Sequence, residues 1–114
     1  MLFIIEKSEL DKRILEFLRL QFNFAAKRNG YLDFKALQHF MLMGHPNTSD
    51  KQLQKGTETL INKFGIQGKV YWRGFLKFYE RTFQSDKKAM GVELTRRGFA
   101  DVTNFSSSFF PNYG

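Results

Sequence analysis

Two stretches of the sequence decide the fold: they read Asn29-Gly30-Tyr31-Leu32-Asp33-Phe34-Lys35-Ala36-Leu37 and Gln67-Gly68-Lys69-Val70-Tyr71-Trp72-Arg73-Gly74-Phe75. In each stretch a glycine, which tolerates a positive φ, is followed two positions later by an aliphatic residue, Leu32 or Val70. Apolar residues at helical spacing follow both stretches. Each half of the chain is therefore predicted to contain a helix, a glycine-containing loop, a short extended segment and a second helix.

The first half of this repeat has recognisable helix ends. Apolar spacings of three and four predict a first helix from about Glu9 to Phe24 or Ala26. Ser8 is the expected N-cap, with Asp11 three residues later as in a capping box. A second helix is expected to begin after a cap at Asp33 and to end at Gly44, which is followed by a proline.

The second half continues in the same way. Ser49 is the expected cap of a third helix, and a fourth helix rich in phenylalanine is predicted to begin near Trp72 or Arg73. Residues 86–97 have the composition of a further short helix, in which Val92 and Leu94 are the large aliphatic side chains. From Gly98 onward the sequence is predicted to be extended or irregular.

The repeat resembles a pair of EF-hands. In that family a central glycine makes the sharp turn, and an aliphatic residue pairs with its counterpart in the sister loop as a minimal antiparallel ladder. Gly30 with Leu32, and Gly68 with Val70, match those positions. The resemblance covers residues 8–84, and it implies two helix-loop-helix units that pair into one lobe.

We therefore expect an all-α protein with two parts. Residues 1–84 are predicted to form the EF-hand-like helical lobe, with the apolar start Met1–Ile5 packed onto its core. Residues 85–114 are predicted to form a C-terminal extension that combines the short helix with an aromatic tail.

The loops differ from those of the family in their metal ligands. A working calcium loop supplies oxygen donors, several of them carboxylates, at fixed positions. The residues at the side-chain positions are Ala25, Lys27, Asn29, Asp33 and Ala36 in the first loop, and Lys63, Gly65, Gln67, Tyr71 and Gly74 in the second. Neither loop is expected to bind calcium at physiological concentrations, and we predict no metal and no cofactor.

Degenerate EF-hand pairs, such as myosin light chains, hold helices or scaffolds without metal. The resemblance thus implies a calcium-independent structural or adaptor subunit of a larger assembly, of which a cytoskeletal or axonemal lattice is an example. Such a lobe can accept an amphipathic helix in a groove. Trp72 and Phe78 on the fourth helix are candidate partner-binding residues, although the same side chains can fill the domain's own core.

The C-terminal extension supplies the other candidate partner-binding residues. They mix positive charge with large apolar side chains, as binding hot spots do. They are Arg96, Arg97, Phe99, Phe109, Phe110 and Tyr113. Packing of this tail over the chain's own helices is the alternative that the sequence leaves open.

The net charge of +7, from 18 basic and 11 acidic residues, favours an acidic partner. That partner is a protein with an acidic surface or an amphipathic helix, or it is nucleic acid. The alternative hypothesis, a small basic nucleic-acid-binding protein, is supported by basic doublets near aromatic residues. Acidic residues interleave with the doublets, however, and no single basic stripe forms. The oligomeric state is left open.

Other classes of function find no support in the sequence. The chain has no cysteine, which excludes disulfides and thiolate metal sites and suits a reducing compartment. Its two histidines, His39 and His45, do not share a helical face, and no catalytic arrangement accompanies them. No apolar run reaches the ~20 residues that a membrane span needs. We expect an intracellular, cytoplasmic protein that is not an enzyme.

Overall fold

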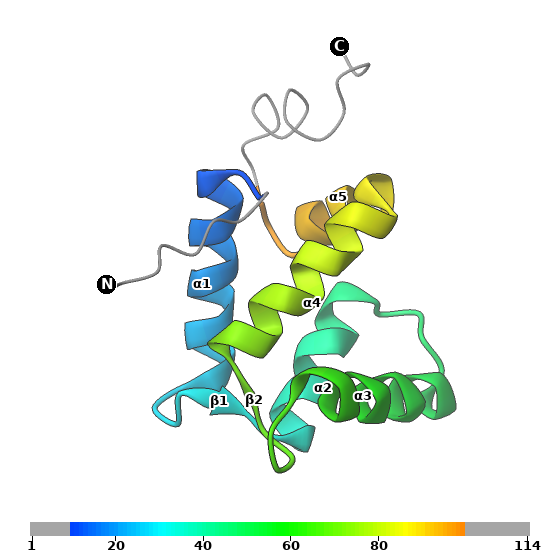
Figure 1. The fold of residues 1–114 in the computed structure, drawn as a ribbon. Helices are drawn as coiled ribbons and strands as arrows, with labels where there is room; N and C mark the ends of the chain where they lie inside the picture. Colours follow the sequence, from blue (N-terminus) through cyan, green and yellow to red (C-terminus); the bar gives the residue numbers. More distant parts are fainter. Residues whose placement is uncertain (1–9, 100–114) are drawn as a thin grey trace, which may run out of the picture.

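The computed structural model describes residues 10–99 of the 114-residue chain. This part contains five helices and one two-stranded sheet (Figure 1). In chain order the elements are α1 (Lys12–Ala26), β1 (Tyr31–Leu32), α2 (Phe34–Gly44), α3 (Asp50–Phe64), β2 (Val70–Tyr71), α4 (Trp72–Ser85) and α5 (Lys87–Arg96). The predicted helical fold with a short ladder is confirmed. The proposed roles of Met1–Ile5, Ser8, Phe109, Phe110 and Tyr113 fall outside the described residues.

Two helices begin at the caps that the sequence predicts. The Asp33 side chain accepts a hydrogen bond of 2.9 Å from the Ala36 backbone N–H at the start of α2. The Ser49 hydroxyl accepts one of 3.2 Å from the Gln52 N–H at the start of α3. Both side chains satisfy a backbone donor that has no partner within its helix.

The first helix begins later than predicted. Its N-cap is Asp11, whose side chain accepts a hydrogen bond of 2.8 Å from the Arg13 N–H. Leu10 and Asp11 are not helical, so the expected start near Glu9 is wrong. The carboxylate of Asp11 caps the helix directly, in place of the capping-box role that its spacing from the serine suggested.

The two loops meet where the sequence predicts. Leu32 pairs with Val70, and Tyr31 with Tyr71, in an antiparallel ladder. Both aliphatic side chains are fully buried. The turns that precede the strands have positive φ angles of 79° at Gly30 and 78° at the equivalent Gly68, which only glycine adopts without strain.

One hydrophobic core joins all five helices. Its fully buried large side chains include Ile14, Leu18, Phe22, Leu32, Leu37, Phe75 and Tyr79. Met90 and Leu94 of α5 are also fully buried in this core, whereas Val92 is 54% exposed. Helix α5, which belongs to the predicted C-terminal extension, therefore packs against the core of the helical lobe.

Neighbouring helices contact α3 along its side and at its C-terminal end. It packs against α2 and also contacts α4, and Figure 1 shows it crossing the lobe below α4. A Cβ added at Gly74, in the first turn of α4, would lie 2.1 Å from the Phe64 carbonyl oxygen. The absent side chain thus lets the end of α3 approach the backbone of α4 closely.

Candidate functional site

An open groove of about 530 Å³ runs along one face of α3. Five residues supply its apolar or side-chain-free surface, and four supply polar groups. The first set is Met41, Gly56, Leu60, Phe64 and Phe78, and the second is Gln52, Lys55, Thr59 and Lys63. We call this surface the α3 groove.

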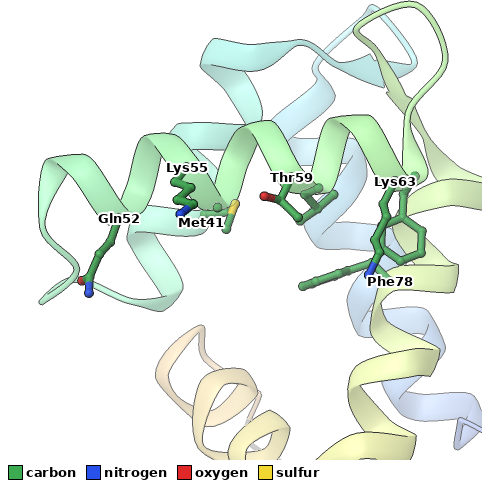
Figure 2. Close-up of a pocket in the computed structure, with 9 residues that line it drawn as sticks. Met41, Gln52, Lys55, Thr59, Lys63 and Phe78 are labelled. Carbon is green, nitrogen blue, oxygen red and sulfur yellow. The ribbon is translucent and has the colours of Figure 1, made fainter.

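The spacing of these residues explains why one helix supplies most of the groove. Lys55, Thr59 and Lys63 recur every four residues, and residues at that spacing share one face of a helix. Figure 2 shows these three side chains on the same side of α3 as Met41 of α2 and Phe78 of α4. The groove is therefore a helix face flanked by one side chain from each neighbouring helix.

At Gly56, beside Lys55, α3 adds no side chain to the groove. A Cβ added at Gly56 would meet its nearest atom, the Met41 Cε, at an ordinary contact distance of 3.4 Å. Beside it, the buried Thr57 hydroxyl donates a hydrogen bond of 2.7 Å to the Leu53 carbonyl oxygen and faces the core side of the helix. The backbone of α3 and the flexible Met41 side chain thus form the floor at this point.

The α4 end of the groove is aromatic and basic. The rings of Phe64 and Phe78 contact edge to face, with centroids 5.9 Å apart. The Arg81 guanidinium lies 5.5 Å from the centroid of the Phe64 ring, which is a cation-π distance. An apolar surface therefore lies beside a fixed positive charge.

Trp72 lines a second hollow, of about 550 Å³, between α1 and α4. Its lining residues are Lys12, Leu15, Glu16, Arg19, Trp72, Arg73 and Leu76. The Arg19 guanidinium lies 4.8 Å from the centroid of the indole ring. One aromatic face of this hollow is therefore occupied by a side chain of the same protein. The two candidate residues on α4, Trp72 and Phe78, line different surfaces.

The candidate residues at the end of α5 contact the protein's own core. The Arg97 side chain is 2% exposed, and its Nη1 donates a hydrogen bond of 2.8 Å to the Phe40 carbonyl oxygen. Phe99 is buried and packs its ring edge to face with Phe17, at a centroid distance of 5.2 Å. Arg96 is exposed, although its Nη1 donates to the Gly44 carbonyl oxygen at 2.9 Å. These arginines anchor α5 to α2.

The sequence analysis missed the buried carboxylate at the centre of this region, Glu93. It accepts a hydrogen bond of 2.5 Å from the Tyr79 hydroxyl and one of 2.8 Å from the Arg97 Nε. The His45 Nε2 lies 3.4 Å from its other oxygen. The sequence signal for its burial was the position of Glu93 between the core residues of α5, three residues after Met90, which places it on the buried face of the helix.

The titration of this cluster follows from its contacts. Burial by itself raises the pKa of the Glu93 carboxyl. The hydrogen bond from His45, the Arg97 charge and the bonds from Tyr79 and Arg97 outweigh burial and lower that pKa to about 2. Burial, followed by the Glu93 charge, raises the pKa of Tyr79 well above its ordinary value. The carboxylate therefore stays charged and the phenol stays a donor, which suits a structural ion pair.

Lysine and tyrosine side chains lie in the paired loops, whereas a calcium-binding loop carries carboxylates. The Lys69 Nζ lies 4.7 Å from the centroid of the Tyr31 ring, and this ring packs against Tyr71 at 5.6 Å. The Asp33 carboxylate caps α2. Within residues 10–99, no three His, Cys, Asp or Glu side chains form a group that could hold a metal ion. In the same residues no helix is long and apolar enough to cross a membrane.

No protein-family model, no curated protein and no solved structure matches the chain. The geometry of residues 10–99 defines a small helical lobe with a ladder between its loops and with open, mainly apolar hollows on its surface, among them the α3 groove. This groove has the shape and chemistry for non-covalent binding of an elongated segment.

Proposed function

We propose that this chain is a calcium-independent, protein-binding structural or adaptor subunit of a larger intracellular assembly. Its lobe is an EF-hand-like pair that has lost the metal ligands, and its role is to hold a segment of another protein. A cytoskeletal or axonemal lattice is an assembly that needs subunits of this kind.

The α3 groove is the observation that carries this proposal. Its apolar surface combines the half-buried side chains of Met41, Phe64 and Phe78 with the bare backbone at Gly56. Apolar side chains that line an open surface lower the free energy of binding when a partner removes them from water. An amphipathic helix is the segment that fits a groove parallel to α3.

The chemistry of the loops supports independence from calcium. Calcium sites need several carboxylates, and the first loop has one, at Asp33, which already caps a helix. In the second loop Lys63 and Tyr71 occupy ligand positions, and Lys69 brings a further cation. The ladder between Leu32 and Val70 stabilises the pair of loops through burial, without a metal.

Two measurements test the proposal. Immobilised full-length protein should retain the same partner from native extract with calcium, with a calcium chelator and with nuclease. Calorimetric titration of the protein should show no calcium binding with a Kd near or below ~10 µM, the range of calcium sensors. Micromolar calcium binding, or retention that disappears with the chelator or the nuclease, contradicts this function.

A second candidate function is binding of nucleic acid. The net charge of +7 and the hollow that places Lys12, Arg19 and Arg73 around Trp72 favour it. The Arg19 guanidinium over the indole ring takes up one face on which a base would stack. Tight binding to a random duplex at low salt, with a steep loss as salt is added, would establish this candidate instead.

A further inference from the structure

We propose that the α3 groove selects an acidic amphipathic helix, whose carboxylates pair with Lys55 and Lys63 while its apolar side chains enter between them. This inference rests on the proposed protein-binding function and specifies its partner. The partner is thus defined by chemistry: a helix with one apolar face bordered by aspartate or glutamate.

The charges along the groove determine the sign of the charge that a partner must carry. Lys55 and Lys63 are exposed, and among residues 10–99 none of those that line the groove is acidic. Arg81 adds a third cation beside the Phe64 ring. A basic helix in this groove would place like charges next to one another at a cost in free energy, whereas an acidic helix forms complementary pairs.

The spacing of the two lysines determines where the acids must lie. They are two turns and a fraction apart on α3, which is about 12 Å at a rise of 1.5 Å per residue. A partner helix aligned with α3 meets both lysines when its carboxylates are about seven or eight residues apart on one face. Thr59 lies between the lysines and leaves this stretch uncharged.

The floor between the lysines determines what the partner inserts. Gly56 lies next to Lys55 and adds no side chain to the floor, which the Met41 side chain covers at this point. Further along, Phe78 provides an aromatic wall. A leucine or a phenylalanine of the partner, one turn from its acidic residue, would pack on this apolar floor beside Phe78 and remove these apolar groups from water.

The test uses the full-length protein and two synthetic helical peptides of about 18 residues. Both peptides carry leucine at helical spacing on one face. One has glutamate two turns apart at the border of that face, and the other has lysine at the same positions. Fluorescence anisotropy should give a Kd for the glutamate peptide that is at least about tenfold lower than for the lysine peptide.

Two double variants assign the effect to the groove. Lys55→Glu with Lys63→Glu should weaken binding of the glutamate peptide about tenfold and should favour the lysine peptide instead. The matched control is Lys35→Glu with Lys88→Glu, which changes the net charge equally at exposed positions of α2 and α5 outside the groove. The control should leave both Kd values within about twofold. Circular dichroism and thermal melts establish that both variants are folded.

Three results would overturn the inference. They are equal binding of the two peptides, equal losses in the groove and control variants, or no saturable binding of the glutamate peptide below ~100 µM. If a duplex oligonucleotide displaces the peptide, and if binding of that duplex is itself lost when Lys55 and Lys63 are replaced, the groove is a nucleic-acid site. If the groove variant still retains a partner from native extract, the protein-binding function stands, but the assignment of its binding site to this groove fails.

Discussion

Replacing Glu93 by glutamine should destabilise the fold by about 3 kcal/mol at neutral pH, because the change removes a buried charge and leaves its arginine unpaired. The magnitude follows from the titration of the carboxyl. Its pKa falls from 4.5 to about 2 on folding, and each unit corresponds to about 1.4 kcal/mol. The loss expected when one partner of a buried ion pair is removed is also at least about 3 kcal/mol.

The pH dependence of stability distinguishes the contribution of the Glu93 charge from that of the shape of its side chain. Because folding lowers its pKa, the carboxylate stabilises the fold fully above pH ~4.5, and this stabilisation is lost as the pH falls toward ~2. Glutamine has nearly the shape of a protonated glutamate and does not titrate. The difference in the free energy of unfolding between the unmodified protein and the Glu93→Gln variant should therefore fall from about 3 kcal/mol at pH ~7 to about 1 kcal/mol at pH ~3.

Urea denaturation at both pH values, followed by circular dichroism, measures these differences. The control is Glu58→Gln, the same chemical change at an exposed position of α3, where less than about 0.5 kcal/mol is expected. A difference for Glu93→Gln that does not change with pH would mean that packing, not the ion pair, accounts for the loss. A stability equal to that of the unmodified protein would refute the reasoning altogether.

Two further predictions concern single residues of the lobe. Gly74→Ala should destabilise the protein by about 2 kcal/mol, because the new Cβ would lie 2.1 Å from the Phe64 carbonyl oxygen. Gly56→Ala, whose Cβ would meet its nearest atom, the Met41 Cε, at an ordinary contact distance of 3.4 Å, should stabilise it by about 0.5–1 kcal/mol through helix propensity. Urea melts that give the two changes the same sign would contradict this account. Asp33→Ala should cost about 1 kcal/mol by removing the cap of α2, and Asp33→Asn should cost much less in the same melts. Equal losses for these two changes would show that the cap hydrogen bond is not responsible.

The parts of the fold that the sequence predicts correctly are governed by local rules. Asp33 and Ser49 cap their helices because a short polar side chain at that position reaches a free backbone N–H. The pairing of Leu32 with Val70 follows from two equivalent turns, each made by a glycine with positive φ. The predicted start of α1 is wrong because Asp11 can serve either as the N-cap or as the N3 residue of a capping box, and both roles fit the same sequence.

The candidate site depends on packing between distant segments, which local rules do not reach. Periodicity places Lys55 and Lys63 on one face of α3, but only the fold determines that neighbouring helices leave this face open. The same limit applies to the doublet Arg96-Arg97. As neighbours on a helix the two arginines diverge, so one side chain is exposed and the other is buried against Glu93.

The net charge of +7 does not by itself identify the basic residues that a partner meets. Arg97 is paired inside the lobe, and Arg19 lies over a tryptophan ring of the same protein. Lys55 and Lys63 differ from these arginines, because they border an apolar groove whose described lining residues include no acid. Added salt weakens exposed ion pairs most, so an acidic helix bound in the groove should lose most of its salt sensitivity when these two lysines are replaced by glutamine. A salt dependence that persists unchanged in that variant would show that the partner is recognised by basic residues elsewhere on the protein.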